Sequence, residues 1–325
     1  MEGHACREGF EDALARELGR SSAREVRRFP GLVLVEPAEG APRADPAFSN
    51  RVLPDARVVE ADSVGKLVRG AFEAVAPLLD RSTAPWALST IALEANASRA
   101  DLVAKELLAL MKEKLRRAFR RMGPQGDLLQ LALPERGVVV ASFVTPSALP
   151  SGFVEPRLPV EIPPDKTAPS SAYRKVEEAY LLLGEAPKAG ERVVDLGAAP
   201  GGWSWTALKR GATVTSVDKA DLLPPVAGAV THLRKDAFSW EPEAPPVDWL
   251  LCDAIAAPDR SIGLLERWLS RKWCRRFVVN VKFKGKEDYA RIDEVRALLA
   301  RNGAVRARVK QLAADKNEVT VLGAC

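Results

Sequence analysis

The segment from Val193 to Asp218, VVDLGAAPGGWSWTALKRGATVTSVD, restricts the fold of this chain more than any other stretch. An apolar run ends at a glycine-rich turn, a segment with helical character follows, and a second apolar run ends at an aspartate. This strand–turn–helix–strand order is typical of α/β proteins that bind an adenosine-containing ligand at the carboxyl ends of parallel strands. Two ligand classes fit the pattern at this level, a dinucleotide and S-adenosylmethionine.

The glycine spacing and three acidic residues separate these two ligands. A dinucleotide fingerprint reads GxGxxG, whereas the turn here reads GAAPGGW. Asp195 precedes the turn, where a carboxylate repels a pyrophosphate but suits the cationic amino acid portion of S-adenosylmethionine. Asp218 ends the second strand and can accept both ribose hydroxyls, and Asp236 follows the third strand and can accept the adenine amino group. A turn without a ligand does not need acids at three successive strand ends, so we predict S-adenosylmethionine as the cofactor. The predicted cofactor contacts are Asp195, Gly197, Ala199, Pro200, Gly201, Gly202, Trp203, Asp218 and Asp236.

The order of elements after the turn predicts the fold of the C-terminal part. Apolar runs that read as strands alternate with amphipathic helices from about residue 192 onward, which predicts an α/β, doubly wound, Rossmann-like sheet. The last two strand candidates, VRARVKQL and EVTVLGA, have no helix between them. We therefore predict that they form an antiparallel hairpin at the edge of the sheet.

Two proline-rich stretches, residues 36–48 and 145–170, divide the chain of 325 residues. A chain of this length is expected to form two or three domains. Before the Rossmann-like part, the pattern predicts a helix and then a strand, followed by a second α+β module with a strand over 86–94 and a hairpin over 128–144. The expected divisions are 1–48 for a short α+β segment, 49–150 for the second module, 151–170 for a linker and 171–325 for the Rossmann-like domain.

A cluster of basic residues lies at the end of a long amphipathic helix predicted over 99–122. The run KEKLRRAFRRMG, residues 112–123, has apolar residues at helical spacing, which gives one packing face and one cationic face. The net charge is +5 and the pI about 9.0, which is compatible with a polyanionic partner. A solvated surface is the common alternative for an isolated basic helix, and both readings stay open here.

Composition excludes several function classes. Four cysteines are scattered without the paired spacing of a zinc site or a disulfide framework, and only two histidines are present. We therefore expect neither a metal site nor histidine-based catalysis. No apolar run is long enough to span a bilayer, and the first residues, MEGHACREGF, have no apolar signal-peptide core. We expect a cytoplasmic protein without a membrane partner.

Four charged residues are candidates for catalysis: three lie at predicted strand ends, and Lys175 lies on the helix predicted before the first strand of the sheet. In a doubly wound sheet, strand ends meet at one edge, next to the cofactor. A ribose 2′-hydroxyl becomes a nucleophile once a base takes its proton, and a neutral lysine can be that base if burial or a second cation lowers its pKa. Lys282 follows the apolar run FVVNV and is the predicted base, with Lys175 as the second cation and Asp253 and Glu318 as orienting groups. A single lysine or glutamate is usually a solvated surface charge, so this hypothesis depends on the four residues lying close together.

These motifs resemble the FtsJ/RrmJ-type 2′-O-ribose methyltransferases, which have a Lys-Asp-Lys-Glu tetrad. The matching segments are SSAYRKVEEAY, DLGAAPGGW, CD, VKF and NEVTV. The closer resemblance is to the RlmM-type family of bacterial 23S rRNA cytidine 2′-O-ribose methyltransferases, and it covers nearly the whole chain. The segment CREGFEDALARELG is similar to that family's opening. RSTAPWALSTIALEA, the basic helix and GVVVASF resemble its THUMP domain, an RNA-binding module.

The resemblance implies Lys282 as the general base, with Lys175, Asp253 and Glu318 completing the tetrad, and it adds Asp253 to the cofactor contacts. It implies small α+β modules, ferredoxin-like and THUMP, before the methyltransferase domain, and 23S rRNA or its precursor as the partner. We expect a monomer. Ser171 stands where relatives often carry arginine, and the N-terminal segment is short; both departures lie outside the tetrad.

Other functions stay open at this level. A base-directed methyltransferase usually needs a catalytic cysteine or an Asn/Asp-Pro-Pro-aromatic signature, and the segment CDAIAAPD has neither form. A non-catalytic RNA-binding protein that retains a methyltransferase fold is a second alternative, which the complete tetrad argues against. A methyltransferase that acts on a different RNA is the third.

Overall fold

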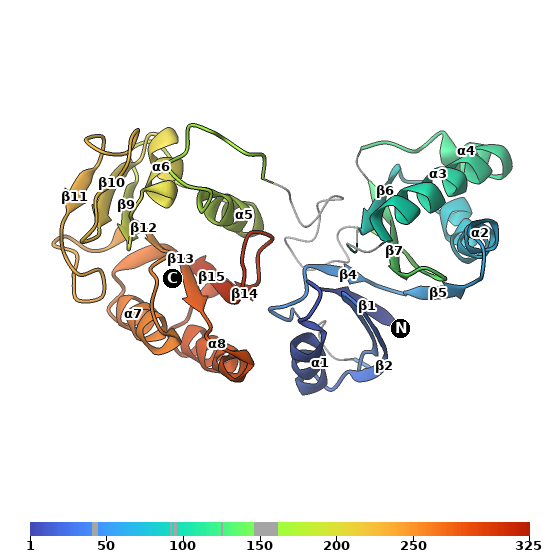
Figure 1. Cartoon of the computed structure of the whole chain (residues 1–325), viewed down its shortest axis with the longest axis horizontal. Helices are drawn as coiled ribbons and strands as arrows, with labels where there is room; N and C mark the ends of the chain where they lie inside the picture. The colour runs from blue at the N-terminus through green and yellow to red at the C-terminus, as the bar shows by residue number, and fades with distance from the viewer. Residues whose placement is uncertain (41–44, 92, 94–95, 125, 146–161) are drawn as a thin grey trace. The chain divides into compact units, whose positions relative to one another are not determined.

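The computed structural model describes residues 1–40, 45–91, 93, 96–124, 126–145 and 162–325. The chain forms two compact units, Met1–Pro159 and Val160–Cys325. Each unit has its own sheets and its own hydrophobic core (Figure 1).

The C-terminal unit is built on one seven-stranded sheet in the order β11-β10-β9-β12-β13-β15-β14. The strands from β9 to β13 pair in parallel, and β15 pairs antiparallel with both β13 and β14. The predicted Rossmann-like sheet and its antiparallel edge hairpin are therefore confirmed. The strands are β9 (Arg192–Leu196), β10 (Thr213–Val217), β11 (Thr231–Leu233), β12 (Val247–Cys252), β13 (Cys274–Lys282), β14 (Val305–Lys310) and β15 (Glu318–Ala324).

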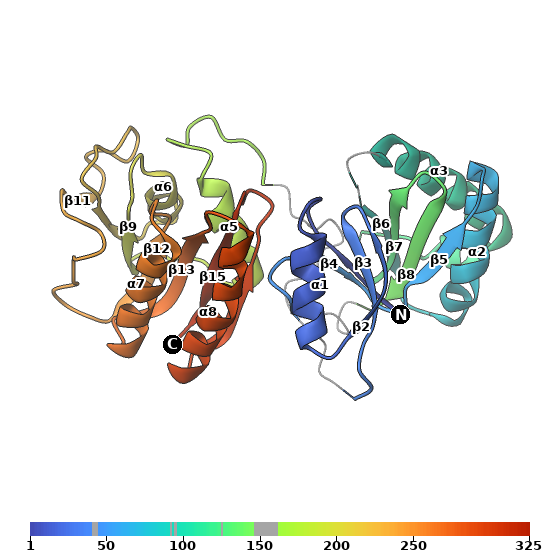
Figure 2. The same ribbon diagram turned by 60° about the horizontal axis from the view of Figure 1, so that its bottom comes forward.

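Helices cover both faces of this sheet (Figures 1 and 2). On one face α5 and α6 pack against each other, and Val176 of α5 and Trp203 of α6 share a core with Trp249 of β12. On the other face α7 and α8 lie side by side, as Figure 2 shows. The helices are α5 (Tyr173–Leu183), α6 (Gly202–Lys209), α7 (Pro258–Ser270), the 3₁₀ helix η3 (Lys286–Ala290) and α8 (Arg291–Arg301).

The N-terminal unit begins with a four-stranded sheet in the order β2-β3-β1-β4, joined by the helix α1. Where one helix and one strand were predicted, the chain folds as a strand, a helix and a hairpin. The hairpin turns at Gly31, whose φ of +69° suits glycine. The elements are β1 (Glu2–Ala5), α1 (Glu11–Arg20), β2 (Arg24–Phe29), β3 (Leu32–Glu36) and β4 (Arg51–Leu53).

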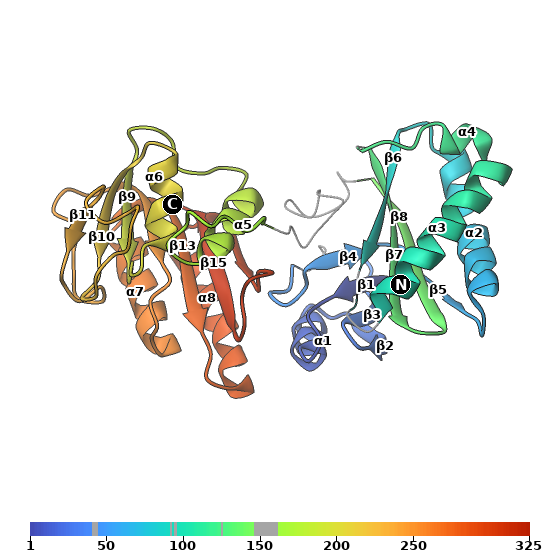
Figure 3. The same ribbon diagram turned by 45° about the horizontal axis from the view of Figure 1, so that its top comes forward.

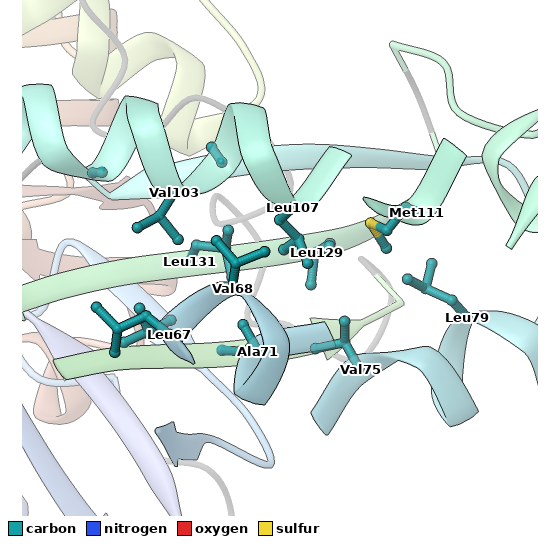
Figure 4. Packing of buried hydrophobic residues seen from close by; sticks show 14 of the residues in the cluster. Leu67, Val68, Ala71, Val75, Leu79, Val103, Leu107, Met111, Leu129 and Leu131 are labelled. Carbon is teal, nitrogen blue, oxygen red and sulfur yellow. The ribbon is translucent and has the colours of Figure 1, made fainter. Parts of the chain in front are cut away.

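A second four-stranded sheet in this unit has the order β5-β8-β7-β6. The predicted hairpin of β7 and β8 is confirmed as an antiparallel pair. The helices α2 and α3 lie side by side against one face of the sheet (Figure 3). Figure 4 shows how side chains of α2, such as Leu67 and Val75, meet those of α3, such as Leu107, over Leu129 of β7. The elements are β5 (Arg57–Glu60), α2 (Val64–Arg81), β6 (Trp86–Ile91), α3 (Ala97–Lys114), α4 (Arg116–Phe119), β7 (Asp127–Glu135) and β8 (Val138–Val144).

The prediction of one continuous helix over 99–122 is wrong. The helix α3 ends at Lys114, because Leu115 has non-helical backbone angles (φ −122°, ψ 52°), and only the four-residue α4 follows. The helix α4 and the residues after it instead bond to the start of β6. Trp86 donates its indole N–H to the Ala118 carbonyl at 2.8 Å, and its backbone N–H to Arg121 at 3.2 Å. Tertiary contacts thus override the helical pattern of the basic run.

Two expected domain boundaries differ from the extent of the folded units. Strand β4 pairs with β1 in the first sheet, so that sheet extends past residue 48. Before residue 171, Ile162 and Ala168 pack against the C-terminal unit, and Tyr173 donates its hydroxyl to the Pro163 carbonyl at 2.5 Å. The C-terminal unit therefore includes part of the expected linker, and residues 146–161 lie outside the described residues.

Candidate active site

The cofactor turn lies at the point where the order of the parallel sheet reverses. The strands β9 and β12 are neighbours, and the chain leaves β9 for α6 on one face and β12 for α7 on the other. Ligands of open α/β sheets bind in the crevice at such a point. A cavity of about 560 Å³ lies there, within the usual size of a small-molecule site. The predicted site residues that line it are Gly197, Ala199, Pro200, Asp218, Asp236, Asp253 and Lys282.

Gly197 is required by close packing between the two strand ends. Its φ is +73°, and a Cβ atom on it would lie 2.5 Å from the Cβ of Ala254. Any other residue would push the turn away from the segment after β12. Asp218 then fixes the turn, because its two carboxylate oxygens accept the backbone N–H groups of Ala199 at 3.0 Å and Ala220 at 2.9 Å.

Asp195 lies beneath the turn rather than on the cavity wall. Its side chain is buried, one carboxylate oxygen accepts the Ser204 hydroxyl at 2.6 Å, and the other has no hydrogen-bond partner among the described residues. Burial raises the pKa of Asp195 to about 7. A buried acceptor without a partner at the cofactor turn suits a ligand that brings a donor, and the cationic amino group of S-adenosylmethionine is one.

Three further predicted contacts, Gly201, Gly202 and Trp203, do not line the cavity. Trp203 is buried in the core and donates its indole N–H to the Ala172 carbonyl at 2.9 Å. Gly201 has a φ of +115° and forms the N-cap of α6. These residues therefore shape the turn from behind.

Asp236 follows β11 in the chain and lines the cavity, and its carboxylate is ionised. Its carboxylate pairs with Lys219 at 2.8 Å and accepts the backbone N–H of Phe238 at 2.8 Å. The hydrogen bond from Lys219, followed by that from Phe238, lowers the pKa of Asp236. An adenine amino group would share this carboxylate with Lys219.

The four candidate catalytic residues come together in one cluster. Lys175 of α5 lies 2.7 Å from Glu318 Oε1 and 3.5 Å from Asp253 Oδ2. Lys282, at the end of β13, lies 2.8 Å from Asp253 Oδ1 and 2.8 Å from the Asp253 carbonyl oxygen. The two lysines thus share one carboxylate. Only Lys282 and Asp253 of this set line the cavity.

The two lysines differ in their surroundings and in the exposure of their side chains. Burial lowers the pKa of Lys175, but the attraction of Asp253, Glu318 and Asp315 outweighs burial, so the net pKa is raised. Lys175 is therefore a fixed ammonium at neutral pH and supplies the second charge expected from the sequence. The side chain of Lys282 is twice as exposed, 24% against 12%, and it faces the cavity.

Two buried polar residues below this cluster, Asn280 and Thr320, were not predicted from the sequence. Asn280 donates its amide to Asp253 Oδ1 at 2.9 Å, and Thr320 donates its hydroxyl to Asn280 Oδ1 at 2.6 Å. Both are fully buried. The available signal was a polar residue inside the apolar run FVVNV, two positions before Lys282.

The described residues contain no group of three or more His, Cys, Asp or Glu side chains placed to hold a metal ion. No helix among them is both long enough and apolar enough to cross a membrane.

Comparison with known proteins agrees with this geometry. Residues 171–276 match the FtsJ-like methyltransferase family. The site and the sheet are therefore those of an S-adenosylmethionine-dependent methyltransferase. Over nearly its whole length the chain is also similar to proteins named ribosomal RNA large subunit methyltransferase M, and it belongs to that family.

Three of these relatives show how far the similarity extends. The protein of Thauera aminoaromatica is 31% identical over 97% of this chain and 93% of its own length. That of Methylococcus capsulatus is 30% identical over 97% and 95%. That of Alkalilimnicola ehrlichii is 33% identical over 98% and 92%.

Proposed function

We propose that this protein transfers the methyl group of S-adenosylmethionine to a ribose 2′-hydroxyl of ribosomal RNA of the large subunit, at a cytidine of 23S rRNA. The observation that carries the proposal is the position of Lys282, whose side chain lines the same cavity as the cofactor turn. The names of the relatives supply the class of RNA. We propose a ribose hydroxyl as the methyl acceptor because this group must lose its proton to react, and Lys282 is placed in the cavity to take that proton.

The contacts of Lys282 suit a general base. When bound, S-adenosylmethionine supplies an electrophilic methyl group. A neutral amine has two N–H donors and one lone pair. Asp253 offers two acceptors to Lys282 Nζ at 2.8 Å, one from its carboxylate and one from its carbonyl, and the Ala254 carbonyl lies farther away at 3.5 Å. The two short contacts match the two N–H donors of a neutral amine, which leaves its lone pair for the hydroxyl in the cavity. Once Lys282 has taken the proton, the Asp253 carboxylate stabilises the resulting ammonium.

Lys175 and Glu318 hold this arrangement in place. The Lys175 ammonium bridges Glu318 and Asp253. It holds Asp253 Oδ2, whereas Lys282 contacts the other carboxylate oxygen, Oδ1. Lys175 also keeps a second positive charge beside the carboxylate that Lys282 contacts. The remaining acceleration comes from alignment of the hydroxyl with the methyl group.

The N-terminal unit is the proposed RNA-binding part, with a THUMP-like module built on the second sheet. Its α4 turn carries Arg116 and Arg117, followed by Arg120, and all three side chains are exposed. We propose that the protein works in the cytoplasm, as a monomer, on 23S rRNA or its precursor. A base-directed or non-catalytic function has no comparable support, because neither needs a lysine held in the cofactor cavity.

Substitution of Lys282 tests the proposal. We expect Lys282→Ala to lower the rate of methyl transfer to 23S rRNA by at least about 100-fold, the usual contribution of a general base, and to keep its affinity for S-adenosylmethionine. Transfer is measured with labelled methyl groups in a single turnover, the product as ribose methylation that blocks alkaline cleavage of the RNA, and cofactor affinity by calorimetry. The matched control is Lys188→Ala, which removes an exposed lysine away from the cavity. A wild-type rate in Lys282→Ala would rule out the base assignment.

A further inference from the structure

The antiparallel register of β13 and β15 places two pairs of polar residues on one face. Lys282 stands opposite Glu318, and two positions further along, Asn280 stands opposite Thr320. Side chains two residues apart in a strand point to the same face. The catalytic pair and the Asn280–Thr320 pair therefore form one short ladder, with the second pair buried below the first.

The direction of the hydrogen bonds in this ladder is fixed by chemistry. A carboxylate only accepts, so the group of Asn280 that lies 2.9 Å from Asp253 Oδ1 is the NH₂ group. The amide oxygen then faces Thr320, which must donate its hydroxyl proton at 2.6 Å. Thr320 Oγ1 also lies 3.1 Å from the buried carboxyl of Asp315, which donates to this oxygen when it is protonated, and burial raises the pKa of Asp315. The result is a chain of polar groups that runs from the sheet interior to the carboxylate shared by both lysines.

Among the described residues, three side chains bond to Asp253, and they differ in stiffness. Lys175 and Lys282 have long side chains with four rotatable bonds, and one of them must change its protonation state during the reaction. Asn280 is short, fully buried and held from below by Thr320. It is the rigid donor that can keep the orientation of the Asp253 carboxylate while the lysines move.

We infer that Asn280 and Thr320 are positioning residues that orient Asp253 and, through it, Lys282 toward the substrate hydroxyl. The inference rests on the proposed function of Lys282. It also gives Thr320 a role that depends on its hydroxyl and not on its shape. A role in packing would depend on the shape of Thr320 and not on its hydroxyl, so substitutions can separate the two roles.

Two substitutions of Thr320 separate these roles. Thr320→Val keeps the shape and removes the hydroxyl, and we expect the single-turnover rate to fall about tenfold, the effect of one buried hydrogen bond. Thr320→Ser keeps the hydroxyl and loses a methyl group, and we expect a rate within about threefold of wild type. Asn280→Ala removes the donor to a charged group, with an expected loss of about 10- to 100-fold. In all three variants, the dissociation constants for S-adenosylmethionine and RNA should stay within about twofold of wild type, so that the loss falls on kcat and not on KM.

The contrary outcomes are distinct. A slow Thr320→Ser variant with a normal Thr320→Val variant shows a packing role and overturns the inference. Equal rates in wild type and both Thr320 variants, with Lys282→Ala inactive in the same assay, overturn the inference and leave the proposed function intact. A wild-type rate in Lys282→Ala overturns both.

Discussion

Glu178 is a buried carboxyl close to the active site whose ionisation opposes folding. It lies on α5, is 5% exposed, and accepts the backbone N–H of Ala313 at 2.8 Å. Burial raises its pKa to about 7, above the value of about 4.3 in an unfolded chain. The folded state therefore binds a proton more tightly than the unfolded state, and the contribution of Glu178 to stability falls as the pH rises between these two values.

Glu178→Gln keeps the acceptor and removes the titration. We expect the melting temperature of this variant to rise above that of wild type as the pH increases from about 5 to about 7, with the difference constant above about pH 8. The measurement is thermal unfolding across this pH range, followed by circular dichroism. Glu243→Gln, at an exposed glutamate, is the control and should follow wild type. Parallel curves for Glu178→Gln and wild type would contradict the buried, raised pKa.

At the scale of elements, the basic turn after α3 has two parts with different roles. Arg121 is half-buried, and its guanidinium donates to the carbonyl oxygens of Leu79 at 2.9 Å and Ser82 at 2.6 Å. It therefore satisfies carbonyl groups at the C-terminal end of α2. Arg116, Arg117 and Arg120 are exposed, and no acidic side chain of the described residues lies within ion-pair distance of them. They are the residues that we propose to contact RNA phosphates.

We expect the combined change of Arg116, Arg117 and Arg120 to glutamate to weaken RNA binding and to reduce its salt dependence. Each lost phosphate contact should lower the slope of log affinity against log salt by about 0.7 to 0.9. Filter binding at several salt concentrations measures both quantities. Arg121→Ala is the contrasting variant, expected to lower the melting temperature because it leaves the end of α2 uncapped. If the triple variant binds RNA as wild type does, the RNA surface lies elsewhere.

Most elements of the C-terminal unit could be predicted because they have locally consistent patterns that alternate between strand and helix. The strand β13, for example, has nine residues and contains the run FVVNV, which is apolar except for Asn280. The missed elements are different in kind. Strand β4 has only three residues, and α2 contains Pro77 and two glycines within an otherwise helical pattern. Such segments adopt their structure through tertiary packing, which a local pattern does not contain.

The same reasoning explains which parts of the site could be predicted. The tetrad followed from strand ends and from resemblance, since strand ends meet at one edge of a parallel sheet. The roles of Asn280 and Thr320 depend on the register between β13 and β15, and the register is decided by pairing across the sheet. Trp203 and Asp195 were predicted to contact the cofactor, and this stays a prediction. Trp203 is buried in the core, and Asp195 is buried beneath the turn with one carboxylate oxygen that has no partner among the described residues.

At the scale of the whole molecule, the two units have separate cores, and this division has a measurable consequence. We expect residues 162–325 expressed alone to fold and to bind S-adenosylmethionine, because the cofactor turn and the tetrad lie within this unit. RNA affinity should fall at least about tenfold when the linked N-terminal unit is removed. Calorimetry with the cofactor and filter binding with RNA give the two values. A fragment that binds RNA as tightly as the full chain would show that the N-terminal unit contributes no affinity.

The contact between Lys175 and Glu318 joins residues that are 143 positions apart in the chain. The cofactor turn, in contrast, is made by neighbours in sequence, from β9 to β10. Closing so long a loop costs more chain entropy than forming a local turn, and Glu318 lies in the hairpin at the sheet edge, where strands open most readily. We therefore expect the cofactor turn to form before the contact between Lys175 and Glu318 as the chain folds. We likewise expect partial opening of the hairpin at the sheet edge to break the catalytic cluster while the cofactor turn stays intact.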